Sequence, residues 1–261
     1  MEIERLGAPL GARVHGVDVR DVDPTTFAAI EAAFHEHHVL VFPEQTLEPE
    51  DQKAFASRFG KLVAHPYNAM EGHPEIIRLD NRGKRKDVNQ HWHSDMPFNA
   101  QPPKLTMLYA LQAPEIGGDT AFANQHLAYE ELSDGLREVV DGLRAVNSAA
   151  GLAQLYRQDP REAPRAEHPV VRTHDATGRR GLYVCKAFTE RFAGWRREES
   201  QPLLEYLFQH AVRPEFQARQ RWHTRDLAMW DNRSVLHFAV HDHAEDVRLI
   251  HRLQVEGDTP A

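Results

Sequence analysis

The chain has 261 residues, the length of one large domain or two small ones. Acidic residues outnumber basic ones, 39 to 31, which gives a formal net charge of −8. This balance argues against a general nucleic-acid binder, because neutralising phosphates requires a basic face. No stretch reaches the roughly 18 apolar residues of a membrane span, and the N-terminus lacks the apolar segment of a secretory signal. We therefore expect a cytoplasmic protein with neither a membrane nor a nucleic-acid partner.

The cysteine and histidine contents direct attention to metal chemistry. The single cysteine, Cys185, excludes an intrachain disulfide and a cysteine-rich zinc site, and we expect it to be a buried packing residue. Histidine is abundant, with 17 residues. Imidazoles bind metals and exchange protons near neutral pH, so metal binding is the first chemistry to consider.

Strand and helix signals follow one another in the first third of the chain. Apolar residues recur at helical spacing over 24–38, where Thr25 or Thr26 is the expected cap. A second helix is predicted over 48–59 and ends before Gly60, a common C-terminal signal. Three strands are expected here, over 12–19, 39–42 and 75–79. The polar run that follows, 80–90, is typical of a solvated loop.

Helix signals become sparse after residue 91. Two helices are predicted, over 198–211 and over 128–143 with a break near Ser133-Asp134-Gly135. Strands and helices do not alternate one for one, which disfavours a doubly wound parallel sheet. The sequence predicts one domain, 1–261, that is mainly β with helices around a sandwich or barrel. The expected strands are 104–111, 145–148, 169–173, 181–184, 218–222, 227–231, 235–240 and 248–255.

A pair of metal ligands is a candidate in the segment His91-Trp92-His93-Ser94-Asp95. On a strand, residues two apart face the same side, so His93 and Asp95 can approach one ion. Chance alone gives roughly 2.5 triplets of the form His-x-acid in this composition, so the triplet by itself decides nothing. Only this triplet ends in Asp and lies among apolar residues. The other two are His73/Glu75, which has no further cue, and His243/Glu245, which lies in a polar run and predicts a solvated loop.

A third ligand is expected at His237, the one polar residue of an apolar strand. A lone histidine in such a strand is more often a core residue, and His91 is a rival ligand. The preceding Trp230-Asp231-Asn232-Arg233 turn and the two later arginines favour His237. Two histidines and one carboxylate leave coordination positions open, as in non-haem Fe(II) oxygenases, whereas a structural zinc site fills four positions.

These residues, in this order, resemble the Fe(II)/2-oxoglutarate-dependent dioxygenases of the taurine dioxygenase type. That family includes alkylsulfatases and aryloxyacetate dioxygenases. The resemblance covers nearly the whole chain and implies a double-stranded β-helix, or jelly roll, with helices outside. Its motifs are Trp92–Asp95, Gly117–Thr120, His168–His174, Trp230–Arg233 with His237, and Arg248 with Arg252.

The resemblance also implies roles for individual residues. His93, Asp95 and His237 would bind Fe(II). Thr120 and Arg248 would hold the distal carboxylate of 2-oxoglutarate, which suits an arginine fork and a hydroxyl donor. The positions around the sulfonate of taurine dioxygenase correspond to His65, Tyr67 (approximately), Asn89 and Arg252. One residue is missing near 65–67 and the segment 148–167 is short, so the substrate side departs from the family pattern.

Arg248 and Arg252 are four apart on the last predicted strand, so we expect both on one face. A buried guanidinium without a partner is costly, which predicts that Arg252 takes an anionic group of the substrate. The expected function is hydroxylation of a small anion with O2 and 2-oxoglutarate, giving succinate and CO2. A sulfonate such as taurine is preferred, with an aliphatic or aryloxy carboxylate or an alkyl sulfate as alternatives.

A non-catalytic, cupin-like metal-binding protein is the alternative from another class. The Thr120/Arg248 pair distinguishes the two, because a protein that only binds metal does not need it. The sequence leaves a homo-oligomer open.

Overall fold

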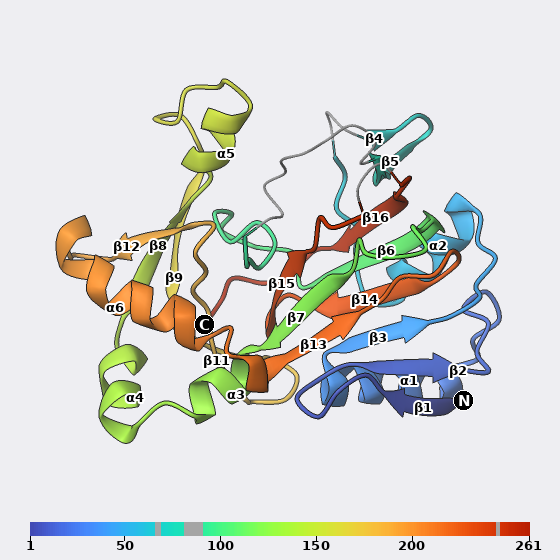
Figure 1. The fold of residues 1–261 in the computed structure, drawn as a ribbon, viewed down its shortest axis with the longest axis horizontal. Coiled ribbons are helices and arrows are strands. Elements are labelled where there is room, and N and C mark those ends of the chain that lie inside the picture. The colour runs from blue at the N-terminus through green and yellow to red at the C-terminus, as the bar shows by residue number, and fades with distance from the viewer. Residues whose placement is uncertain (66–68, 81–90, 244–245) are drawn as a thin grey trace.

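The computed structural model describes residues 1–65, 69–80, 91–243 and 246–261. Two sheets face each other (Figure 1): a large sheet in the order β1-β2-β3-β14-β6-β16-β5-β4 and a small sheet in the order β13-β7-β15. Among the described strand pairs of the large sheet, only β2 and β3 run parallel. The large-sheet strands are β1 (Glu2–Arg5), β2 (Ala12–His15), β3 (Val39–Phe42), β4 (Ala69–Met70), β5 (His73–Asp80), β6 (Leu105–Gln112), β14 (Leu227–Asp231) and β16 (Leu249–Val255). The small-sheet strands are β7 (Thr120–Asn124), β13 (Gln217–Gln220) and β15 (Val235–Ala239).

Apolar side chains fill the space between these two sheets. Val41, Leu108 and Ile250 of the large sheet form one buried cluster with Phe122 and Val235 of the small sheet. Antiparallel strands that alternate between two facing sheets make a jelly roll, the fold that the sequence predicted.

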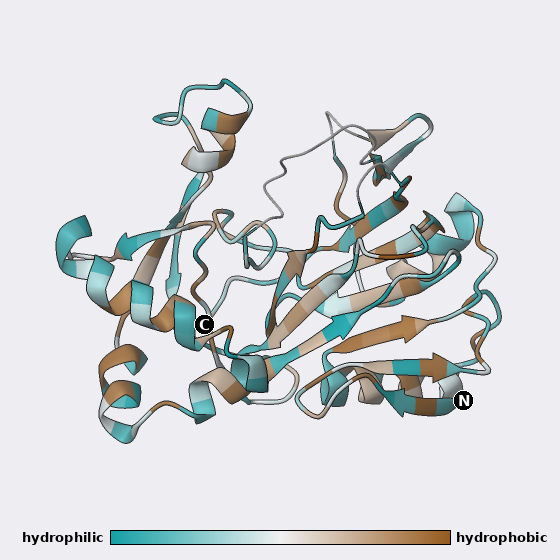
Figure 2. Cartoon of the chain, in the orientation of Figure 1, coloured by the Kyte–Doolittle hydropathy of each residue, from teal (hydrophilic) through white to brown (hydrophobic). Residues whose placement is uncertain are grey.

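Helices α1 (Pro24–His37) and α2 (Pro49–Ser57) cover the outer face of the large sheet. Their residues Phe34 and Phe55 pack with Phe42 of β3 in a second buried cluster. Because β3 is covered on both faces, it is apolar along its length (Figure 2), which is why a short uninterrupted apolar run predicts it. The N-cap of α1 is Asp23, whose carboxylate accepts a hydrogen bond from the N–H of Thr26 at 2.7 Å. The prediction that Thr25 or Thr26 caps this helix is therefore wrong.

The remaining elements form a second layer beside the jelly roll. They contain a three-stranded sheet, β12 (Thr189–Phe192), β8 (Arg144–Ser148) and β9 (Arg165–Pro169), and a hairpin of β10 (Val171–Thr173) and β11 (Arg180–Leu182). Four helices contribute residues to one buried cluster that also contains Phe192 of β12. They are α3 (Gln125–Glu130), α4 (Asp134–Asp141), α5 (Ala150–Leu155) and α6 (Arg197–His210). Among the described residues, no helix is long and apolar enough to cross a membrane.

Several boundaries differ from the predicted ones. The helix predicted over 128–143 is indeed broken, but it begins at Gln125, and Ser133 caps its second part by accepting the N–H of Leu136. The strand predicted over 169–173 is split at Val170, whose N–H donates to Leu143. The unpredicted elements β1, β4, β7, β9 (apart from Pro169), β12 and α5 are short. β7 reads TAFAN, and its alanines give little strand signal, so pairing on both sides holds it in place.

Candidate active site

A backbone bridge brings the predicted metal ligands together. The N–H of His93 donates to the carbonyl of His237 at 3.1 Å, and the reverse bond is 2.8 Å. This bridge is isolated, so the prediction of a regular strand at His93 and Asp95 is wrong. The two Nε2 atoms nevertheless lie 3.8 and 3.7 Å from Oδ1 of Asp95, and all three side chains are buried.

These three residues fit a metal ion. Two ligands at about 2.1 Å from one ion lie at most about 4.2 Å apart, and both nitrogen–oxygen distances fall below that limit. Nδ1 of His93 donates to the carbonyl of His91 at 2.7 Å, which leaves Nε2 as the ligand atom. The side chain of the rival residue, His91, is exposed and does not join the group.

Charge and hydrogen bonds orient the carboxylate of Asp95. Its Oδ2 accepts from Thr106 Oγ1 at 2.6 Å and from Gln254 Nε2 at 2.9 Å, so Oδ1 faces the histidines. Burial alone would raise the pKa of Asp95. The guanidinium of Arg252 lies 3.1 Å from Oδ1. Its charge and the two histidines outweigh the effect of burial and hold the pKa of Asp95 below its ordinary value.

The substrate side differs from the sequence expectation at Arg252. It is paired with Asp95, so the premise of an unpartnered guanidinium is wrong. The charge of Arg252 also acts on His65. Burial is the larger cause and the charge of Arg252 the second, and both lower the pKa of His65. Tyr67 and Asn89, the other two predicted substrate residues, lie outside the described residues.

The two predicted 2-oxoglutarate residues share a neighbour, Trp222. Its indole N–H donates to Thr120 Oγ1 at 3.0 Å, and the guanidinium carbon of Arg248 lies 5.6 Å from the centre of its ring. Arg248 is buried and lies one residue before β16, which also has a register shift between Leu249 and Ile250. The argument that Arg248 and Arg252 share the face of a regular strand is therefore wrong. Trp222 carried no sequence signal of its own.

The backbone turn at Gly118 lies against the side chain of Arg248 and requires glycine. Nε of Arg248 donates to the carbonyl of Gly118 at 3.0 Å. A Cβ at Gly118 would lie 3.2 Å from Arg248 Cδ and 2.9 Å from Pro114 Cγ, and its φ of +68° disfavours other residues. The carboxylate of Asp242 accepts the N–H of Gly118 at 2.8 Å and closes this turn.

His243 and Cys185 are both buried in the structure. His243 is only 6% exposed, so the prediction of a solvated loop is wrong there, while Glu245 lies outside the described residues. The hydrogen bond between Asp242 and Gly118 holds this segment against the protein, a contact that local polarity does not predict. Cys185 is confirmed as a buried residue, and burial raises the pKa of its thiol.

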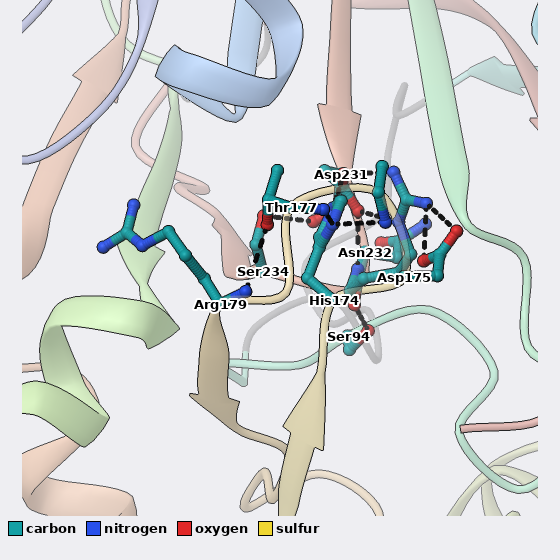
Figure 3. A network of polar contacts seen from close by, with 10 residues as sticks. Ser94, His174, Asp175, Thr177, Arg179, Asp231, Asn232 and Ser234 are labelled. Atoms are coloured by element: carbon teal, nitrogen blue, oxygen red, sulfur yellow. Dashed lines mark hydrogen bonds and ion pairs between the residues drawn. The ribbon is translucent and has the colours of Figure 1, made fainter. Parts of the chain in front are cut away.

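A polar network anchors the turn between β14 and β15 (Figure 3). His174 and Asp175, from the β10–β11 hairpin, approach Asp231 at the end of β14. Nε2 of His174 lies 2.9 Å from Asp231 Oδ2, and Arg233 donates to both carboxylate oxygens of Asp231 at 2.8 and 2.6 Å. Burial would raise the pKa of Asp231, but Arg233 and His174 hold it well below its ordinary value.

Two buried histidines beside this network predict a pH dependence of stability. The rings of His38 and His126 lie 5.1 Å apart, and burial lowers the pKa of His38 to about 3 and of His126 to about 4. Between their ordinary value, near 6.5, and these values the unfolded chain binds more protons than the folded one. Stability should therefore fall as the pH falls through this window, by on the order of a few kcal/mol.

Urea denaturation at several pH values measures this effect. His126→Asn, whose side-chain amide can replace Nδ1 as the donor to the carbonyl of Arg180, should flatten the decline between pH 6.5 and 4. His15→Gln, at a histidine whose side chain is 39% exposed, serves as the control and should leave the decline unchanged. A wild-type slope in the His126→Asn variant would contradict the assignment.

A jelly roll that brings two histidines and a carboxylate together has the ligand arrangement of the non-haem Fe(II) oxygenases. The model of the taurine catabolism dioxygenase TauD, TfdA family matches residues 2–254, and the chain belongs to this family. The family, fold class, enzyme class and cofactors that the sequence predicted, namely Fe(II), 2-oxoglutarate and O2, are thereby confirmed.

Three similar proteins illustrate the range of the family. An α-ketoglutarate-dependent sulfate ester dioxygenase from Pseudomonas putida is 36% identical, with 100% of this chain and 91% of that protein covered. The crystal structure of a taurine dioxygenase from Burkholderia xenovorans is 36% identical and has a TM-score of 0.88, with 100% and 90% covered. The structure of AAD-2 in complex with Mn(II) and N-oxalylglycine is 28% identical and has a TM-score of 0.86, with 99% and 98% covered.

Proposed function

We propose that this dioxygenase hydroxylates a small organic substrate that carries a terminal –SO3⁻ group, either a sulfonate such as taurine or a sulfate ester. The observation that carries this proposal is the guanidinium of Arg252, 20% exposed and 3.1 Å from the candidate ligand Asp95. A protein of net charge −8 has no general attraction for anions, so a local cation must capture them. The sulfate ester and taurine dioxygenases among the similar proteins support a sulfur oxyanion.

The proposed site divides the chemistry among three groups of residues. His93, Asp95 and His237 hold Fe(II), which together with 2-oxoglutarate and O2 supplies the oxidising power for hydroxylation, with succinate and CO2 as products. Thr120 and Arg248 bind the distal carboxylate of 2-oxoglutarate by charge-assisted hydrogen bonds. The substrate anion is bound by His65, Tyr67, Asn89 and Arg252.

Aromatic side chains restrict water beside the proposed metal site. The ring of Phe188 lies 6.0 Å from the ring of His93, and the ring of Phe98 lies 5.2 Å from that of Phe188. Phe98 and Phe188 are buried. Excluding water strengthens the pairing of each anion with its arginine and protects reactive species from side reactions.

We also infer that residues 1–261 act as one catalytic domain in the cytoplasm. The proposed ligands come from positions as distant as His65 and Arg252, and Arg252 contacts Asp95 directly. A site assembled from both halves of the chain supports a single working unit. The free, buried Cys185 is compatible with a reducing compartment.

A substrate panel and an Arg252 variant test this function together. Taurine, an alkyl sulfate, an aryloxyacetate and a neutral isostere are compared for succinate formed and for hydroxylated product. We expect the neutral compound to couple poorly, with 2-oxoglutarate consumed but little product formed. Arg252→Ala should lose about 30-fold or more in substrate affinity, since a desolvated charge pair is worth roughly 2–5 kcal/mol. Its decarboxylation of 2-oxoglutarate without substrate should fall less.

Arg252→Lys is the matched variant, because it keeps a cation near Asp95 and removes the fork. Its substrate affinity should lie between those of wild type and Arg252→Ala. Equal turnover of the neutral isostere and its anionic parent would overturn the proposal. Faster turnover of the aryloxyacetate than of either sulfur oxyanion would move the substrate class to carboxylates.

A further inference from the structure

Thr106 lies at the meeting point of three strands of the large sheet. In the middle strand, β6, it is directly opposite Trp230 of β14 and Gln254 of β16. All three residues are buried. Its hydroxyl oxygen lies 2.6 Å from Asp95 Oδ2, 2.9 Å from Asn232 Nδ2 and 3.1 Å from Gln254 Nε2.

The direction of each hydrogen bond in this chain is determined by chemistry. An indole N–H can only donate, so the side-chain atom of Asn232 that lies 3.0 Å from Trp230 Nε1 must be the amide oxygen. The amide nitrogen of Asn232 therefore faces Thr106 and donates to its oxygen. Because a hydroxyl has one proton, that of Thr106 is left to donate to Asp95 Oδ2.

Asn232 and its neighbour Trp230 also lie near the other two candidate ligands, Asn232 through Ser94 and Trp230 against His237. The backbone carbonyl of Asn232 accepts from Ser94 Oγ at 2.8 Å, and Ser94 lies between His93 and Asp95 in the chain. The ring of Trp230 lies 4.7 Å from the ring of His237. The backbone N–H of Asn232 donates to Lys104 at 2.9 Å, and the Asp231 network of Figure 3 holds the outer side of the turn.

We propose that Asn232 is a positioning residue for the metal centre, acting through Thr106 on the carboxylate of Asp95. The directed chain Trp230–Asn232–Thr106 occupies Oδ2 together with Nε2 of Gln254 and leaves Oδ1 facing the two histidines, so that Asp95 would bind the ion through one oxygen. One-oxygen binding keeps coordination positions open for 2-oxoglutarate and O2. This inference rests on the proposed function, because it presupposes the metal site at Asp95.

The Mn(II) dissociation constant, measured from the electron paramagnetic resonance signal of free Mn(II), reports this role directly. Loss of a hydrogen-bond partner behind a metal ligand typically weakens metal binding about 10- to 100-fold. We expect that loss in Thr106→Val and in Asn232→Leu, both of which keep the number of side-chain heavy atoms. Thr106→Ser keeps the hydroxyl and should restore wild-type affinity. The double variant should bind Mn(II) as tightly as the single variant with the larger loss, because both residues act along one chain of hydrogen bonds and their effects should not add.

A second buried pair provides the matched control. Thr189 Oγ1 donates to Asn147 Oδ1 at 2.7 Å in the separate sheet of β8 and β12. Asn147→Leu and Thr189→Val remove a comparable buried hydrogen bond. They should lower the melting temperature while the Mn(II) dissociation constant stays within twofold of wild type.

The outcomes separate this inference from the proposed function. If the wild-type protein does not bind Mn(II), the metal centre itself is overturned. If wild type binds and folded Thr106→Val binds equally well, Asn232 and Thr106 are only structural. Additive losses in the double variant would likewise overturn the directed chain. Trp230→Phe, which keeps an aromatic ring and removes the indole N–H, should weaken binding in the same direction even if Asn232→Leu does not fold.

Discussion

Replacing Asp95 by Ala should abolish Fe(II)-dependent turnover, with a loss of at least about 100-fold, since even partners behind a ligand contribute up to that factor. The carboxylate supplies the one negative ligand and the bond to Arg252 at 3.1 Å. Its removal leaves Arg252, Thr106 and Gln254 without that partner but removes little packing volume. The protein should therefore remain folded, with lower stability. Succinate formation, bound iron and the circular dichroism spectrum test these points.

Asp95→Asn is the matched variant for this prediction. It keeps the volume and one oxygen acceptor for Thr106 and Gln254, and it removes the charge and replaces the other oxygen with an NH2 group. It should fold better than Asp95→Ala and be nearly as inactive. Near wild-type activity with intact iron content in either variant would show that Asp95 is not a ligand.

The second large effect is expected for Arg248→Ala. Loss of a desolvated charge-assisted pair costs about 2–5 kcal/mol, which corresponds to a rise of roughly 30-fold to several thousand-fold in the 2-oxoglutarate requirement. Mn(II) binding should be largely unaffected, because Arg248 contacts Gly118 and Trp222 rather than the triad. Titration of 2-oxoglutarate against succinate formed measures the change.

Arg248→Lys should show an intermediate requirement, since lysine keeps the charge but lacks the planar fork. Arg213→Ala removes an exposed arginine paired with Glu215 and controls for the change in net charge. An unchanged apparent affinity for 2-oxoglutarate in Arg248→Ala would place this arginine outside the cosubstrate site.

Elements that bury a continuous apolar run or a regular helical stripe were predictable from local pattern. β3 and the helices α1, α2 and α6 belong to this group, because each shows a distinct periodicity or apolar run. β7 was not predictable in this way. Its register against β13 and β15 places Thr120 in the small sheet, and long-range pairing decides that register.

The candidate site shows the same division. The residue types and spacing of His93 and Asp95, together with the family resemblance, were sufficient to select the ligands that the structure brings together. The reason expected for their convergence, a shared strand face, was wrong, and the actual reason is the bridge to His237. Spacing along the chain does not reveal which distant backbone a segment will pair with.

The sequence by itself determined which residue types are available for chemistry, namely the candidate metal ligands and the arginines, and it determined the apolar strands of a mainly β fold. Only the tertiary structure decided the partners. It paired Arg252 with Asp95, buried His243 against the turn at Gly118, and set Thr106 between Trp230 and Gln254. The physical reason is that side-chain identity and period are local properties, whereas a hydrogen bond or ion pair depends on strand register between residues far apart in the chain.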